Sequence, residues 1–386
     1  MQTERLYYQD SHLREFDAQV RSCAPGKHGW DVVLDRTAFY PEGGGQPGDT
    51  GLLGGVRVTD THERNGAVVH YCDAPLEVGT QVRGEIDWQR RFDLMQQHSG
   101  EHLVSGIIHR RFGYENVGFH MGAEMITIDL SGMLTPEQLE AIEAEANEAV
   151  WRDLPTEITH PDPEALKTIP YRSKKELTGD VRIVAFPGVD ICACCGTHVS
   201  STGEIGLIKL FSCEKFHDGV RIELLCGRRA LAHLSALAAQ NRQISGLLSA
   251  KPLETASAVR RTLDELSQQK LRAAGLEARI LDAQAEDYRG AGNVLLFEKD
   301  LTPDTLRRLA DAITSRCGGR CAVFSGSDET GYKYCLGETG GDLRQLSRDL
   351  NAALSGRGGG KPFFVQGSVQ ASRQAIEAFF EERDRT

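Results

Sequence analysis

Residues 29–88 carry short runs of β-branched and aromatic side chains, separated by turns rich in Gly, Asn and Pro. Runs of this length, bounded by turn-forming residues, are typical of β-strands in a small all-β unit. The runs fall at residues 30–34, 56–59, 67–71 and 80–86. We therefore predict that residues 1–89 form a small β-barrel.

The pattern changes at residue 90, where helical and strand-like segments begin to alternate. Residues 90–112 are predicted to be helical. A second helix is predicted from Thr135 towards Val150, because Thr135-Pro136-Glu137 supplies an N-cap residue followed by a proline at the first helical position. Strands are expected at residues 124–130, 181–186 and 204–211. This mixture predicts an α+β domain over residues 90–226.

Residues 227–284 are rich in Ala, Leu, Gln and Arg, and their apolar positions follow a helical register interrupted once, at Lys251-Pro252. Two helices in a hairpin or coiled coil would fit residues 227–289. A C-terminal α/β domain is predicted over residues 290–386, with strands at 294–297 and 321–325, a helix at 303–316, and a Gly-rich loop at 355–362.

Composition is ordinary for a multidomain globular protein, with 386 residues, 40% hydrophobic and 26% charged. No apolar run approaches the roughly 20 residues of a spanning helix, and the first residues lack the apolar segment of a signal peptide. We therefore expect a cytoplasmic protein. The net charge of −11 argues against indiscriminate nucleic-acid binding but not against a local basic surface.

Two pairs of residues at four-residue spacing are candidate metal ligands: His98 with His102, and Cys194 with His198. Residues four apart on a helix share a face, and imidazole with thiolate suits Zn²⁺. One His pair alone would arise often by chance in a chain with 12 histidines, whereas the second pair makes a metal site the better interpretation. The fold must bring the pairs together across 92 residues of sequence (194 − 102).

At this point the motifs resemble a known family. Residues 37–51 (Thr-Ala-Phe-Tyr-Pro-Glu-Gly-Gly-Gly-Gln-Pro-Gly-Asp-Thr-Gly), the His98/His102 pair, residues 196–199 and residues 202–206 are similar to the editing domain of alanyl-tRNA synthetase and to its free-standing AlaX relatives. The Gly-rich segment before Lys361-Pro362 resembles the C-terminal domain of that synthetase, which also occurs beside DHH-type phosphoesterase domains. The resemblance covers nearly the whole chain and fits the long AlaX form.

The resemblance implies hydrolysis in trans of mischarged tRNA(Ala), chiefly Ser-tRNA(Ala) with Gly-tRNA(Ala) as a further candidate, while Ala-tRNA(Ala) is spared. It also implies Zn²⁺ held by His98, His102, Cys194 and His198. Four protein ligands would close the ion and make it structural, whereas a catalytic zinc keeps an open position, so both roles stay open. Relatives have Gly where this chain has Cys195; Cys195 or Cys192 could replace Cys194 as ligand, although a buried, inert thiol is the simpler interpretation of both.

Four further sites gain expected roles. Gly43, Gly44 and Gly45 either form a tight turn or let backbone N–H groups approach an acyl or phosphate oxygen, with Gln46 hydrogen-bonding the substrate. Thr37 is expected to recognise the serine hydroxyl, the alternative being an ordinary β-branched strand residue. His120 would orient substrate or water, unless it is a core histidine. The glutamine, the threonine and the histidine are thus the catalytic candidates.

Basic residues provide candidate tRNA contacts, and the C-terminal half provides a candidate dimer contact. A homodimer is expected through the helical segment and the last domain, and Cys317 and Cys321 are expected in the core. The candidate phosphate ligands are Arg90-Arg91, Lys174-Lys175, Arg228-Arg229, Arg357 and Lys361.

Taken together, the sequence predicts an α+β multidomain protein: an N-terminal small β-barrel, an α+β zinc-binding editing domain, a helical linker and a C-terminal α/β domain. Two other functions remain open. One is a non-catalytic, zinc-stabilised module for tRNA binding or dimerisation. The other is a DHH-type phosphoesterase, which the absence of an Asp-His-His sequence disfavours.

Overall fold

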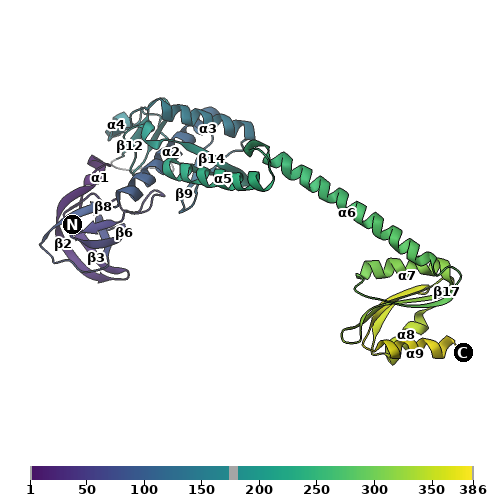
Figure 1. Ribbon diagram of the computed structural model, residues 1–386. Helices are drawn as coiled ribbons and strands as arrows, with labels where there is room; N and C mark the ends of the chain where they lie inside the picture. The colour runs from purple at the N-terminus through teal and green to yellow at the C-terminus, as the bar shows by residue number, and fades with distance from the viewer. Residues whose placement is uncertain (1, 174–180, 385–386) are drawn as a thin grey trace. The chain divides into compact units, whose positions relative to one another are not determined.

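The computed structural model describes residues 2–173 and 181–384 and divides the chain into two compact units, residues 1–243 and 244–386 (Figure 1). Both units combine helices with strands, which confirms the predicted α+β multidomain class. Among the described residues, no helix is long and apolar enough to cross a membrane.

Six strands near the N-terminus pair in a closed ring in the order β2-β3-β7-β6-β5-β8. The ring closes because β8 pairs with both β5 and β2. Along β8, buried and exposed residues alternate, as expected when one sheet face lines a core. Beside the ring, β1 (Glu4–Arg5) pairs with β4 (Arg36–Thr37), and α1 (Leu6–Gln9) follows β1. The six strands are β2 (Glu15–Gly26), β3 (Gly29–Leu34), β5 (Gly51–Leu53), β6 (Val56–Arg64), β7 (Ala67–Cys72) and β8 (Gln81–Ile86).

Helix α2 (Trp88–Phe112) is the central element of the rest of this unit. It begins where the Asp87 side chain accepts a hydrogen bond from the Arg90 N–H, and it ends at Gly113, whose φ of 69° is left-handed. Sixteen of its residues are buried, far more than one amphipathic face would require. The helix is therefore enclosed on most of its circumference.

Two antiparallel sheets and one long helix surround α2. The larger sheet has the order β14-β15-β10-β9, and the smaller has the order β11-β12-β13. Residues 202–205, predicted to begin a strand at 204, instead form a 3-10 turn, because Gly206 has a φ of 80° that an extended strand does not adopt. The elements are β9 (Asn116–Met121), β10 (Ile126–Leu130), α3 (Pro136–Trp151), β11 (Glu157–Thr159), α4 (Pro163–Leu166), β12 (Ile183–Phe186), β13 (Asp190–Ala193), η1 (Thr202–Ile205), β14 (Ile208–Phe216) and β15 (Gly219–Cys226).

The C-terminal α/β unit is a five-stranded sheet, β16-β17-β18-β20-β19, with helices on both faces. The chain reaches it through α5 (Gly227–Leu247) and α6 (Thr255–Glu286), which are separated near Lys251-Pro252 as predicted. The expected Gly-rich loop is partly wrong: Arg357–Lys361 is the edge strand β19, paired with β20. The remaining elements are η2 (Pro252–Glu254), β16 (Gly292–Glu298), α7 (Pro303–Cys317), β17 (Gly318–Ser327), β18 (Gly331–Glu338), α8 (Arg344–Ala353), β20 (Phe364–Val369) and α9 (Arg373–Asp384).

Candidate metal centre

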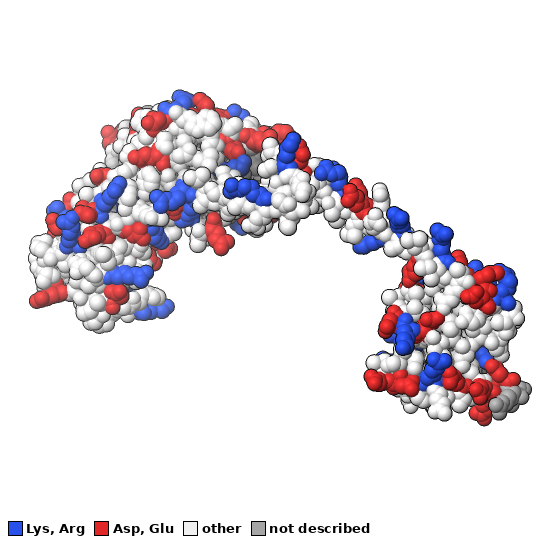
Figure 2. Space-filling model, in the orientation of Figure 1, with Lys and Arg blue, Asp and Glu red and all other residues white. Residues whose placement is uncertain are grey.

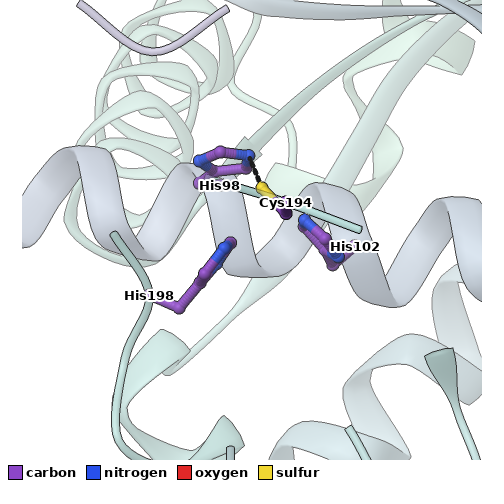
Figure 3. Close-up of side chains that lie close together, drawn as sticks. All are labelled: His98, His102, Cys194 and His198. Carbon is purple, nitrogen blue, oxygen red and sulfur yellow. Dashed lines mark hydrogen bonds between the residues drawn. The ribbon is translucent and has the colours of Figure 1, made fainter. Parts of the chain in front are cut away.

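The structure brings together the two residue pairs that the sequence separates. His98 and His102 project from one face of α2, and Cys194 and His198 come from the segment after β13 (Figure 3). One ligand atom from each of the four residues lies within 4.8 Å of the others. The Cys194 Sγ is 3.4 Å from the His98 Nε2. Three imidazoles and one thiol thus form a compact N₃S donor set of the kind that suits Zn²⁺.

The three histidines are held by hydrogen bonds at Nδ1. The His98 Nδ1 lies 2.9 Å from the Gln46 Oε1, and the His102 Nδ1 lies 2.9 Å from the Asp190 Oδ2. The His198 Nδ1 lies 3.4 Å from the Ser99 Oγ. In each ring this leaves Nε2 for another partner, which is the arrangement found around metal-binding histidines.

Two observations show that these residues fit a cation. The His198 Nε2 is buried and has no hydrogen-bond partner among the residues that the structure describes, a costly state for a polar atom unless a ligand satisfies it. Burial opposes ionisation of the Cys194 thiol, but the neighbouring His98 and His198 outweigh it and hold the pKa of Cys194 well below its usual range. A thiolate is the form that binds metal. His98, His102, Cys194 and His198 could therefore hold Zn²⁺.

Asp190 supports the centre and was not found by sequence analysis. Burial raises its pKa, but hydrogen bonds from His102 and Arg172 outweigh burial, so the net shift is downward. The Arg172 Nε donates to the Asp190 Oδ1 at 2.7 Å, and a second guanidinium nitrogen donates to Oδ2 at 2.9 Å. A carboxylate of this kind orients a metal-bound imidazole and increases its basicity. Neither residue belongs to a recognisable local motif, so only the fold could identify them.

Comparison with known proteins places the chain in a family. The alanyl-tRNA editing protein AlaX-L of Pyrococcus horikoshii is 30% identical, with 97% of this chain and 96% of the relative covered. The chain belongs to the alanyl-tRNA editing protein family. The alanyl-tRNA editing protein Aarsd1 of Mus musculus is 29% identical over 97% of this chain and 96% of its own length. An alanine–tRNA ligase of Pyrobaculum neutrophilum is 33% identical, but this chain covers only 44% of it.

Three family models match successive parts of this member of the alanyl-tRNA editing protein family. A class II (A) tRNA synthetase model matches residues 2–90, which contain the strand ring. The second additional domain of threonyl and alanyl tRNA synthetases matches residues 181–223, which include Cys194 and His198. The DHHA1 domain matches residues 290–385, the sheet of the second unit.

The structure places some of the other expected site residues beside the four-residue centre and others elsewhere. Gln46 lies beside His98, at the end of the Gly43–Gln46 turn. His120 is exposed on β9, next to Phe119, whose ring packs against His98 with centroids 5.5 Å apart. His120 is therefore not a core histidine. Arg357 and Lys361 lie on β19 of the second unit.

Thr37 is fully buried beside the strand ring and hydrogen-bonded to His70 of β7. The His70 Nδ1 donates to the Val32 carbonyl at 3.0 Å, so its Nε2 accepts the Thr37 hydroxyl at 2.8 Å. The Thr37 Oγ1 in turn accepts the Phe39 N–H at 3.1 Å. Among the described residues, no hydrogen bond joins Thr37 to the metal centre. Because the Thr37 hydroxyl donates its hydrogen bond to His70, it can only accept a further hydrogen bond.

His70 should make the first unit less stable in acid. Burial lowers its pKa to about 4, against the opposing effect of the Val32 hydrogen bond, while 6.5 is the ordinary value. Between about pH 6.5 and pH 4, His70 is therefore protonated in the unfolded chain but neutral in the folded chain. The free energy of unfolding falls as the pH drops through this range. We expect the decrease in unfolding midpoint between about pH 7 and pH 5 to be smaller in His70→Gln than in wild type. Urea titrations followed by tryptophan fluorescence measure this, and parallel decreases would contradict it.

Two expectations about individual side chains were wrong. Cys195 is exposed rather than buried, whereas Cys192, Cys317 and Cys321 are buried as expected. Arg91 cannot contact phosphate, because it is fully buried and paired with Asp49. The candidate phosphate ligands Lys174 and Lys175 lie outside the described residues.

Proposed function

We propose that this protein is a trans-editing deacylase that hydrolyses the aminoacyl ester of mischarged tRNA(Ala). Serine is the proposed main substrate residue, glycine a second one, and Ala-tRNA(Ala) is spared. The observation that carries the proposal is the N₃S centre of His98, His102, Cys194 and His198, in a chain that aligns along its length with alanyl-tRNA editing proteins.

Zn²⁺ bound there would add positive charge that polarises an ester carbonyl or holds the site together. The chain's own residues do the remaining work. Asp190 and Gln46 orient two imidazoles, and the burial of His98, His102 and His198 keeps bulk water from the three rings, while Cys194 is half-buried. We propose that His120, exposed beside the ring that covers His98, contacts the aminoacyl end of the tRNA.

We propose a tRNA phosphate contact on the C-terminal sheet. Lys333 of β18 and Arg357 of β19 both face Ser368 of β20 across the strands, so two cations flank one hydroxyl. These residues line a hollow that also includes Gln366, and Lys361 lies exposed further along β19. Figure 2 shows basic and acidic side chains interspersed elsewhere on the visible face. A local pair of cations is therefore a better candidate than a general basic field.

The proposed function is tested by incubating wild type with Ser-tRNA(Ala), Gly-tRNA(Ala) and Ala-tRNA(Ala), with zinc content recorded. Loss of serine with alanine retained supports editing. Thr37→Val provides a second comparison: reduced discrimination between Ser and Ala would support substrate recognition by its hydroxyl, whereas lower stability with unchanged discrimination would assign Thr37 to the barrel alone. A folded, zinc-loaded wild type without turnover would leave the non-catalytic tRNA-binding module as the function.

We further propose a homodimer through α6. Val259, Leu266, Ala273 and Ile280 recur at seven-residue intervals, the spacing of a coiled-coil seam. The three larger side chains are 41%, 49% and 66% exposed, so the stripe has no apolar cover within the described part of this chain. Exposed apolar stripes on helices commonly mark a partner surface.

Placing a charge in the seam should dissociate the dimer. We expect Leu266→Glu to convert a dimer into a monomer in light scattering after size exclusion, since two carboxylates would face each other in an apolar seam. Leu271→Glu is the matched control, because Leu271 is 72% exposed but lies off the stripe. A monomeric wild type, or equal dissociation by Leu271→Glu, would contradict the seam.

A further inference from the structure

The Gly-rich segment is a tight turn that aims Gln46 at the metal centre. The N–H and carbonyl groups of Gly43 and Gln46 form two reciprocal hydrogen bonds of 3.0 Å, which closes a two-residue hairpin. Gly44 and Gly45 have φ values of 60° and 85°, both left-handed, as in the type I′ turn that glycine favours. The glycines thus fix the backbone from which the Gln46 side chain enters the protein.

The orientation of the Gln46 amide is fixed by a backbone group. The Thr197 N–H can only donate, and it lies 3.1 Å from the atom that must therefore be the Gln46 Oε1. The Gln46 Nε2 then donates to the Thr197 hydroxyl at 2.7 Å. A flipped amide would place two donors against each other.

This orientation determines which nitrogen of His98 carries the proton. The Gln46 Oε1 lies 2.9 Å from the His98 Nδ1, and an amide oxygen only accepts, so Nδ1 must be the donor. In the neutral ring the lone pair is then on Nε2, the atom that faces the Cys194 Sγ. These contacts link the Thr197 N–H through Gln46 to the His98 Nε2, which lies 3.4 Å from the Cys194 Sγ.

Two glycines leave space for this contact. A Cβ on Gly196 would lie 2.2 Å from the His98 Cε1 and 2.9 Å from the Gln46 Oε1. A Cβ on Gly45 would lie 2.8 Å from a ring carbon of Phe119, the ring that packs against His98. Gly45 and Gly196 therefore leave Gln46 and His98 close enough to form their hydrogen bond.

We propose that Gln46 is a positioning residue that sets the tautomer and orientation of His98 for metal binding, in place of the substrate contact expected from the sequence. The proposal rests on the proposed metal-dependent function, but it concerns metal affinity rather than turnover. It also gives the Gly-rich segment a structural role. The turn at residues 43–46 carries Gln46, and Gln46 hydrogen-bonds His98 on α2.

The test compares zinc affinity of full-length variants by competition with a chromogenic chelator. We expect Gln46→Met, which keeps length but cannot accept a hydrogen bond, to bind zinc about 10–100-fold more weakly. Gln46→Glu should stay within about threefold of wild type, because its carboxylate still accepts from His98 and Thr197. Gln97→Met is the matched control: Gln97 is equally buried on α2 but hydrogen-bonds the Cys226 backbone.

Wild-type affinity in Gln46→Met, or an equal loss in Gln97→Met, would overturn the proposal. If Gln46→Met does not fold, the tautomer of His98 in the zinc-loaded wild type decides the matter through long-range ¹H–¹⁵N correlations. Protonated Nδ1 supports the proposal, and Nδ1 bound to zinc overturns it. Deacylation is assayed separately. If the variants show the expected zinc affinities but the wild type does not hydrolyse Ser-tRNA(Ala), the proposed function is refuted and the role of Gln46 stands.

Discussion

Cys194→Ala should lose both bound zinc and deacylase activity. The Cys194 Sγ lies against the His98 Nε2 and is the sulfur in the four-residue centre. Its removal leaves three imidazoles and no anionic ligand, so the favourable charge interaction between a thiolate and a divalent cation disappears. Since loss of a supporting group alone typically costs 10–100-fold in affinity or activity, we expect hydrolysis of Ser-tRNA(Ala) to fall by about 100-fold or more.

The neighbouring cysteines provide matched controls for this prediction. Cys195 is exposed and absent from the four-residue centre, so Cys195→Ala should keep wild-type zinc content and activity. Cys192 lies near His102 and Asp190, but burial raises the pKa of its thiol and Arg172 already pairs with that carboxylate. Cys192→Ala should therefore retain zinc as well. Zinc is measured by atomic absorption on dialysed protein; zinc retained in Cys194→Ala but lost in either control would move the sulfur ligand to that cysteine.

The four residues of the centre could be predicted because their signal is local. Four-residue spacing on a helix places His98 and His102 on one face whatever the tertiary fold, and the same spacing joins Cys194 to His198. The groups that orient these ligands have no such signal. Asp190 reaches His102 from a strand 88 residues away in sequence, and Gln46 reaches His98 across 52 residues. Only strand pairing and packing determine those distances.

The same distinction applies to the fold. Runs such as residues 30–34 and 67–71 matched strands β3 and β7 closely, because alternation and turn residues are local properties. Strand β2, which pairs with both β3 and β8, was not predicted although residues 15–20 alternate polar and apolar side chains. Its second half, residues 21–26, breaks this alternation and ends in Pro-Gly, so the strand there depends on its partners. Strand β19 was taken for a loop because Gly358, Gly359 and Gly360 favour turns. In the fold, Gly358 gives space to the Tyr334 hydroxyl.

Arg91→Met should destabilise the first unit by about 3–5 kcal/mol, because it leaves the carboxylate of Asp49 buried without its charge partner. Both side chains are almost completely buried, and the Arg91 Nε donates to the Asp49 Oδ2 at 2.8 Å. The guanidinium also donates to the carbonyl oxygens of Ser11 and Ala38. Arg91 lies on α2 and Asp49 follows the Gly-rich turn. The hydrogen bonds of Arg91 therefore connect the N-terminal strands to the helix that carries His98.

Tryptophan fluorescence during urea unfolding reports this unit selectively, because all three tryptophans, Trp30, Trp88 and Trp151, lie within residues 1–243. The matched control is the ion pair of Arg83 and Glu15, whose side chains are 59% and 55% exposed. Arg83→Met should cost less than about 1 kcal/mol, since water screens and solvates both charges. The double variant Asp49→Asn/Arg91→Met should be destabilised by less than the sum of its single variants, because the uncompensated charge is then absent. Additive effects would show that Arg91 acts through its two carbonyl contacts and not through Asp49.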